Sequence, residues 1–137
     1  MLLVYNFKDA QLCYAMNKNI MMEVMIPNRA QFDEFEKTGI PWRNVVAFVG
    51  HNPPQDRTLY ELIHGRGASC MVGTSRNLDL RLAGLREGSI DALEQDYRRL
   101  LQLGADLIET DLPGQVGNSL YGKSHPPSSK RNFFRGN

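Results

Sequence analysis

The sequence shows no strong excess of charge of either sign. Its 137 residues include 16 lysines and arginines and 15 aspartates and glutamates, so the formal net charge is +1. Proteins that capture nucleic acid electrostatically usually carry a basic stripe, so this balance argues against nucleic acid as a partner. Basic residues gather near the C-terminus, among prolines and serines, at Lys123, Lys130, Arg131 and Arg135. We interpret that segment as a solvated or docking tail.

Long hydrophobic runs and cysteines are also scarce. No apolar segment approaches the roughly 18–20 residues that a membrane-spanning helix needs, so we predict no membrane span. The first residues, MLLVYNFKD, lack the basic region of a secretory signal. Only Cys13 and Cys70 occur, each within apolar sequence. This context favours free, buried thiols over a disulfide or a metal-binding pair.

The sequence does have a regular alternation of strand-like and helix-like segments. Short apolar runs predict five strands, at residues 2–7, 20–26, 45–50, 68–73 and about 107–108. Helices are predicted between them, at residues 8–16, 28–38, 59–63 and 89–103. Their start signals are Asn28 as an N-cap, Thr58 with Glu61 as a capping box, and Ser89. Residues 77–88 are predicted to form a loop that contains at most one helical turn.

This alternation predicts an α/β fold with parallel strands joined by right-handed crossovers. The short spacing between strands is typical of barrels, but a complete (β/α)₈ barrel takes about 250 residues. We therefore expect a partial TIM-type barrel of about five strands over residues 1–113, followed by a C-terminal tail over residues 114–137. Association with another chain could complete such a barrel.

The most informative stretch is GADLIETDLP, Gly104–Pro113. Gly104 is expected to end the preceding helix in a left-handed conformation, which carries no steric penalty for a residue without Cβ. Leu107 and Ile108 then form a short strand, which Thr110, Asp111 and Pro113 end. A hydroxyl and a carboxylate thus stand at the carboxyl end of a strand, where β/α folds bind ligands.

Three stretches together resemble the later strands of the glycerophosphodiester phosphodiesterase family, in the same order. They are IPWRNVVAFVG at 40–50, GASCMVGT at 67–74, and the segment from Tyr97 to Pro113. The resemblance covers roughly residues 1–120. It implies a barrel that hydrolyses phosphodiesters, with two histidines as acid and base and with carboxylates that hold calcium or magnesium.

The catalytic signature that the resemblance implies belongs to the first half of the family's barrel, and it is not found here. The sequence contains no His-Arg, Glu-Asn or His-Asp pair. His64-Gly65-Arg66-Gly67 is expected at the C-terminus of a helix, which is the wrong face for barrel catalysis and suits the helix dipole. Glu109 and Asp111 could share one face of a strand as a metal pair, but a turn in which Asp111 accepts backbone hydrogen bonds is favoured.

The remaining candidates are polar residues at or near the carboxyl ends of strands. His51 could contact a phosphate or act as an acid or base, or it could pack on Trp42 or the Pro53-Pro54 turn. Thr74, Ser75 and Arg76 could hold an anionic headgroup, together with Asp111, or form a solvated loop.

Glu23 is a further candidate, because it lies within an apolar strand where a carboxylate needs a cation or a partner. It is either a metal ligand or paired with Lys8.

Three hypotheses follow from the sequence. The chain is the C-terminal part of a phosphodiesterase-like barrel whose acid, base and metal groups come from an absent N-terminal part. Alternatively, it is a barrel-derived binding or assembly module, whose open sheet edges favour a dimer or a larger homo-oligomer. The third hypothesis is an unrelated small β/α hydrolase that uses His51, Glu23 and Asp111.

Overall fold

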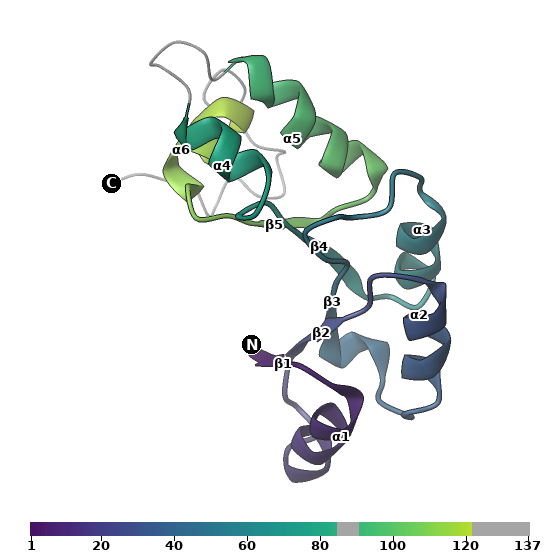
Figure 1. Ribbon diagram of the computed structural model, residues 1–137. Helices are drawn as coiled ribbons and strands as arrows, with labels where there is room; N and C mark the ends of the chain where they lie inside the picture. The colour runs from purple at the N-terminus through teal and green to yellow at the C-terminus, as the bar shows by residue number, and fades with distance from the viewer. Residues whose placement is uncertain (85–90, 122–137) are drawn as a thin grey trace.

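The computed structural model describes residues 1–84 and 91–121, which form one five-stranded parallel sheet (Figure 1). The strands lie in the order of the sequence, with every neighbouring pair parallel. They are β1 (Leu2–Val4), β2 (Met22–Met25), β3 (Val45–Phe48), β4 (Ser69–Gly73) and β5 (Leu107–Glu109). A doubly wound sheet would reverse its strand order at a switch point. This sheet does not, so it is an arc of a barrel, as the sequence predicts.

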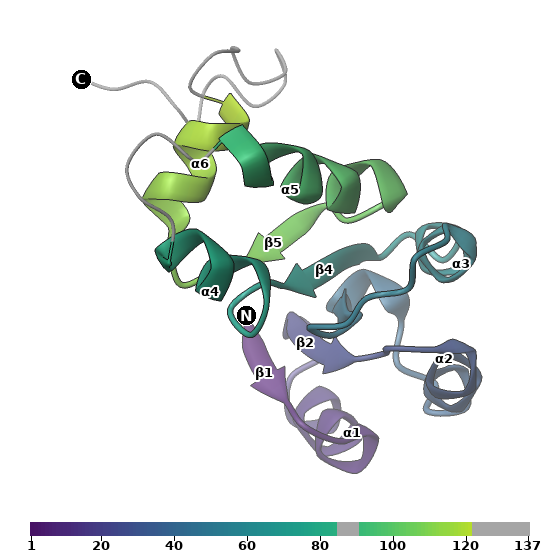
Figure 2. The same ribbon diagram turned by 45° about the horizontal axis from the view of Figure 1, so that its top comes forward.

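Helices connect the strands. They are α1 (Phe7–Met16), α2 (Arg29–Glu36), α3 (Thr58–His64), α4 (Leu78–Ala83), α5 (Asp91–Leu103) and α6 (Pro113–Tyr121), and a 3₁₀ turn, η1 (Trp42–Asn44), precedes β3. The strands follow an arc, with α1, α2 and α3 on its outer side (Figure 1, Figure 2). In the described part of the chain, no helix has both the length and the hydrophobicity to cross a bilayer.

Strand residues alternate between the two faces of the sheet, as the period of two requires. The outward residues of β3 and β4, including Ala47, Cys70 and Val72, join the main core beneath the helices. The inward residues Val46, Phe48 and Met71 form a separate small cluster. The concave face therefore has its own thin apolar floor, which no helix of the described chain covers in Figure 2.

Helix boundaries confirm some of the predicted caps and correct others. Asn28 caps α2 by accepting a hydrogen bond from the Gln31 N–H (3.0 Å). Gly104 follows α5 with φ of +127°, in the region that favours glycine. The capping box at Thr58 is wrong, because Arg57 occupies the N-cap position and makes no side-chain cap. Asp56 instead accepts a hydrogen bond from the Thr58 N–H.

Two other differences lie near the carboxyl edge of the sheet. Residues 78–83 form the helix α4 within the segment expected to be mainly loop. Helix α6 occupies the first residues of the expected tail, and Val116 and Leu120 pack against α5 at Leu93 and Tyr97. Ser89, the expected cap of α5, and the basic cluster of the tail lie outside the described residues.

A buried carboxylate ties this second cluster together. Asp79 of α4 is 3% exposed. It accepts hydrogen bonds from the Tyr97 hydroxyl, the Thr110 hydroxyl and the Asp111 backbone N–H, each at 2.8 Å. Burial alone would raise the pKa of this carboxyl, but the nearby Thr74 side chain and these hydrogen bonds outweigh burial and hold its pKa below the usual value of 3.8. Asp79 therefore joins α4, α5 and the end of β5.

Candidate functional site

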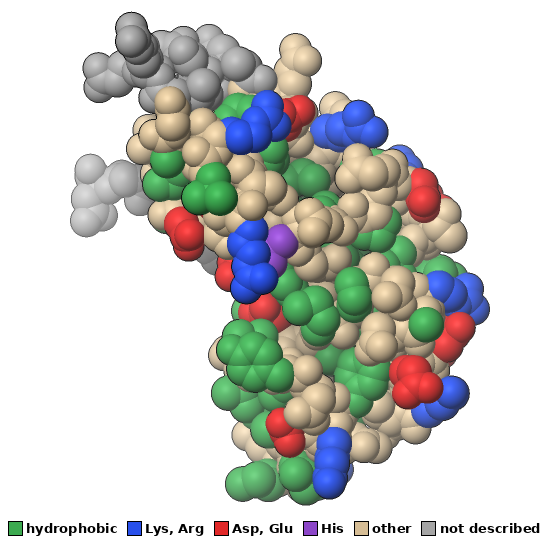
Figure 3. All heavy atoms as spheres, viewed as in Figure 1, with side chains coloured by type: hydrophobic (Ala, Val, Ile, Leu, Met, Phe, Trp, Pro, Cys, Tyr) green, Lys and Arg blue, Asp and Glu red, His purple; other side chains and the backbone are tan. Residues whose placement is uncertain are grey.

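A pocket of about 320 Å³ opens on the concave face, toward the carboxyl ends of the strands. Its polar lining comes from four residues: Glu23, His51, Arg76 and Glu109. The apolar part of the lining comes from β1, β2 and β3 and from Tyr5 just after β1: Leu3, Val4, Tyr5, Met25 and Phe48. Figure 3 shows the hollow side of the molecule, with charged side chains and a histidine beside hydrophobic ones. Charged groups of both signs thus meet over an apolar floor.

His51 is positioned by close packing at the end of β3. Its ring stands edge-on to Phe48, with centroids 5.4 Å apart, and not on Trp42, whose ring pairs with those of Phe32 and Phe35. The ring also lies against Gly73, where a Cβ would come within 2.6 Å of His51 Cε1. The backbone carbonyl of His51 accepts a hydrogen bond from the Asn77 amide. Because Gly73 has no Cβ, the imidazole of His51 can pack against the backbone of β4.

The buried Nδ1 of His51 has no hydrogen-bond partner within the described chain. A buried polar atom without a partner is costly and calls for an explanation. The ring is held by packing, and Nδ1 is not satisfied by the protein itself. An imidazole in this state can still donate to or accept from a ligand in the pocket through its other nitrogen.

Glu23 and Glu109 supply negative charge from opposite parts of the arc. Glu23 lies on β2, half-buried, and Glu109 ends β5. Burial, together with the Glu109 carboxylate, raises the pKa of Glu23 above 4.5. No ion pair joins Glu23 to Lys8 in the described chain, so that predicted pairing is wrong. A cation bound between two carboxylates in a pocket would reduce the repulsion between them.

Arg76 is the one residue of the expected anion-binding loop that lines the pocket. Thr74 is fully buried, and its hydroxyl donates to the Glu109 carbonyl (3.1 Å), so it fastens β4 to β5 and is closed to a ligand. Ser75 and Asp111 do not line the pocket. Asp111 is exposed beyond β5, and its backbone N–H donates to Asp79. The acceptor in the expected turn is thus Asp79.

Glu109 lines the pocket without Asp111, the residue with which it could form a metal pair according to the sequence. The turn pattern begins only after Glu109, because β5 ends there and Asp111 lies past the strand. The signal that could have identified Glu109 is its register. It pairs with Gly73, next to the strand end from which Arg76 follows. Chemically, the pocket combines a guanidinium for phosphate oxygens, an imidazole, and two carboxylates suited to a hard cation.

Comparison with known proteins identifies a solved structure with a similar fold. No family model matches the sequence, and no curated protein matches it. A solved structure, the glycerophosphoryl diester phosphodiesterase from Parabacteroides distasonis ATCC 8503, superposes with a TM-score of 0.80 at 28% sequence identity. The match covers 97% of this chain and 45% of that chain. The resemblance seen in the sequence and the partial-barrel fold are both confirmed, and the chain spans less than half of its structural neighbour.

Proposed function

We propose that this chain is the C-terminal part of a glycerophosphodiester phosphodiesterase-like barrel, and that its pocket receives the phosphate of a glycerophosphodiester. The observation that supports this most is the placement of Arg76 and His51 together at the carboxyl end of a β/α arc. That end is where β/α barrels bind substrates. The structural neighbour is a glycerophosphoryl diester phosphodiesterase, and this gives the substrate class of the proposal.

In this proposal each pocket residue has a role. Arg76 donates hydrogen bonds to the nonbridging phosphate oxygens, since a guanidinium matches them well. His51 donates to the same phosphate or exchanges a proton with it, while its ring stays fixed against Phe48 and Gly73. Leu3, Met25 and Phe48 form an apolar wall that keeps water from one side of the ligand.

Glu23 and Glu109 fit the calcium or magnesium ion expected of the complete enzyme. Burial, together with repulsion by the Glu109 carboxylate, raises the pKa of Glu23, and a bound cation would offset both effects. A bound divalent cation would supply charge stabilisation at a phosphoryl oxygen. Two carboxylates are a minority of the six to eight oxygens that calcium takes. We therefore expect the isolated chain to bind the cation weakly and to need the missing half for turnover.

The test separates phosphate binding from catalysis. Glycerophosphocholine hydrolysis is followed with added calcium or magnesium, and glycerol 3-phosphate binding is measured by calorimetry. We expect negligible turnover and weak binding. Arg76→Ala should weaken binding about tenfold or more, as loss of a charge-assisted hydrogen bond does. The control Arg43→Ala removes an exposed arginine of η1, and it should leave binding unchanged.

Two results would contradict the proposal. Robust metal-dependent turnover by this chain alone would show that no further strands are needed. Equal binding by the Arg76 and Arg43 variants would show that the pocket does not hold the phosphate. The alternative hydrolase that uses Asp111 receives no support from the geometry, because Asp111 is not in the pocket lining with His51 and Glu23.

A second candidate function is self-association, and a specific observation favours it. On β1 and the turn after it, large apolar side chains are exposed: Leu2 (43%), Leu3 (47%) and Tyr5 (82%). An uncovered apolar strand edge is a site where another chain pairs. We expect a dimer or larger assembly by light scattering, and Leu3→Lys should shift it toward the monomer. A monomer at high concentration would refute this candidate.

A further inference from the structure

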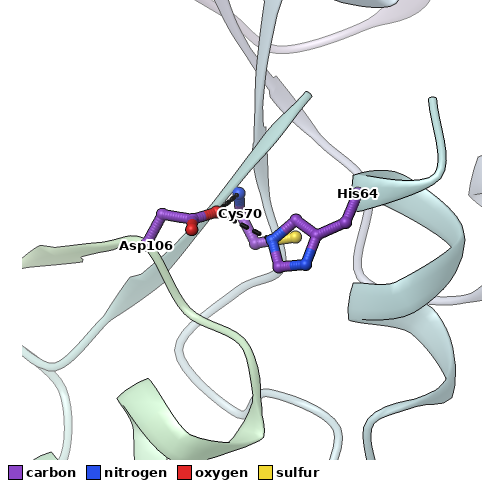
Figure 4. A group of neighbouring side chains, drawn as sticks. All are labelled: His64, Cys70 and Asp106. Carbon is purple, nitrogen blue, oxygen red and sulfur yellow. Dashed lines mark hydrogen bonds and ion pairs between the residues drawn. The ribbon is translucent and has the colours of Figure 1, made fainter. Parts of the chain in front are cut away.

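A second group of side chains lies at the other end of the sheet, where β4 and β5 begin. His64 is the last residue of α3, Cys70 is the second residue of β4, and Asp106 immediately precedes β5. Figure 4 shows the three side chains converging from these three elements. None of them lines the concave pocket, which opens toward the carboxyl ends of the strands.

The three side chains are already held close together. One ligand atom of each residue lies within 4.8 Å of the others. His64 Nε2 lies 2.8 Å from Asp106 Oδ2, and the same oxygen accepts the Cys70 backbone N–H at 2.8 Å. The carboxylate is thus anchored by the backbone of β4, while its other oxygen makes no hydrogen bond within the described chain. Such anchoring is how proteins orient metal ligands.

Burial distinguishes the three donors in a useful way. Cys70 is fully buried, whereas the side chains of His64 and Asp106 are 38% and 43% exposed. A metal ion from solvent could therefore first contact the imidazole and the carboxylate and then bind the buried sulfur. Burial, with the nearby Asp106 carboxylate, raises the pKa of the Cys70 thiol to about 12.

The donor chemistry favours one class of ion. A sulfur, an imidazole nitrogen and a carboxylate oxygen suit zinc, whereas calcium and magnesium select oxygen ligands alone. Tetrahedral zinc with bonds of about 2.0–2.3 Å needs donors roughly 3.3–3.8 Å apart. The donor atoms already lie within 4.8 Å of one another, and those of His64 and Asp106 belong to partly exposed side chains, so small side-chain rotations would reach that spacing.

We propose that His64, Cys70 and Asp106 form a zinc site with an open fourth position for water, which joins the end of α3 to the starts of β4 and β5. On binding, His64 gives the Nε2 lone pair, Asp106 gives a carboxylate oxygen, and Cys70 gives its sulfur and releases the thiol proton to solvent. The site is separate from the proposed phosphate pocket and does not depend on it.

Cobalt(II) titration of the reduced, purified chain tests this proposal. Cobalt replaces zinc and gives a near-ultraviolet charge-transfer band only when a thiolate binds it. This band also distinguishes the site from binding at the carboxylates and histidine of the pocket. We expect the band to saturate at one cobalt per chain, and zinc to abolish it. Zinc should also raise Tm, and a chelator should reverse that shift.

Three variants complete the test. His64→Ala alters an exposed side chain, so it should fold, and it should lose the stoichiometric band. Asp106→Asn keeps an oxygen that can accept from the Cys70 N–H but loses the negative charge. It should weaken cobalt binding about tenfold or more, because even the loss of a residue that only hydrogen-bonds to a metal ligand has an effect of that size. Cys13→Ala removes the other cysteine, on α1, and should leave the band unchanged.

The proposal fails if the wild-type chain gives no thiolate band with stoichiometric cobalt. It also fails if the band persists undiminished in His64→Ala, or if it disappears in Cys13→Ala. Because His64 is exposed and Cys13 is only partly buried, both variants are expected to fold, and the result does not depend on whether a Cys70 variant folds.

Discussion

Replacing Tyr97 by phenylalanine removes one hydroxyl from the buried network around Asp79. Tyr97 is 1% exposed, and its hydroxyl donates to Asp79 Oδ1 at 2.8 Å. The phenylalanine ring fills the same space, so the change is confined to one hydrogen bond to a charged acceptor. Such bonds contribute about 1.5–3 kcal/mol, and we expect Tyr97→Phe to lower the free energy of unfolding by about 2 kcal/mol.

Urea unfolding at pH 7 measures this change by circular dichroism and by the fluorescence of Trp42, the single tryptophan. With a slope of about 2 kcal/mol per molar urea, the midpoint should fall by about 1 M. Tyr5→Phe is the matched control, because Tyr5 is 82% exposed, and its midpoint should not move. Equal midpoints for the two variants would refute the argument that Asp79 binds the hydroxyl.

The pH dependence of the effect has a defined sign. The pKa of Asp79 is held below 3.8 in the folded state. A carboxylate with a depressed pKa stabilises the fold above its unfolded pKa, and this contribution is lost as the pH falls through the folded value. The difference between wild type and Tyr97→Phe should therefore be largest near neutral pH and shrink in acid.

Further predictions concern the pocket and the helix end. Glu23→Gln should stabilise the fold at pH 7, because the pKa of Glu23 is raised above 4.5 and the folded protein disfavours its ionised form. Below pH 4.5 Glu23 is protonated in both the folded and the unfolded state, so the urea midpoints of variant and wild type should converge there. Gly104→Ala would place a side chain at a φ of +127° and bring its Cβ within 2.6 Å of the Tyr60 Cβ. Scanning calorimetry should therefore show a Tm that is lower by at least about 4 °C. Gly73→Ala should cost about 1–3 kcal/mol in urea unfolding by overpacking against His51 and Phe48, and should shift the imidazole NMR signals.

The fold could be inferred from the sequence largely because its signals are local. Apolar runs bounded by Asn28, Gly39 and Gly104 mark where strands and helices stop, since caps and positive φ values depend on a few neighbouring residues. Helix α4 was missed because the Asp79 carboxylate, which fixes it to the fold, has its side-chain partners on α5 and beyond β5. Contacts that distant in sequence leave no local pattern.

The site was only partly visible for a related reason. His51 and Arg76 each stand three residues past the end of a strand, so their position could be predicted from order along the chain. Thr74 comes directly after β4, but its hydroxyl donates to the Glu109 carbonyl of β5 and does not reach the pocket. The zinc-type cluster joins residues that are 6 and 36 positions apart, and it became visible only when α3, β4 and β5 were placed together.

The two outer strands of the sheet, β1 and β5, are unlike one another, and this difference sets the symmetry of any assembly. Two β1 edges related by a twofold axis across the strands would run antiparallel, whereas β5 against the β1 of a neighbour continues the parallel pattern. Such head-to-tail junctions end only when a ring closes. Every junction then uses the same β1 edge, so one charged substitution on β1 would interrupt all of them at once. A closed ring has no terminal subunit, so a subunit can leave only when two junctions break.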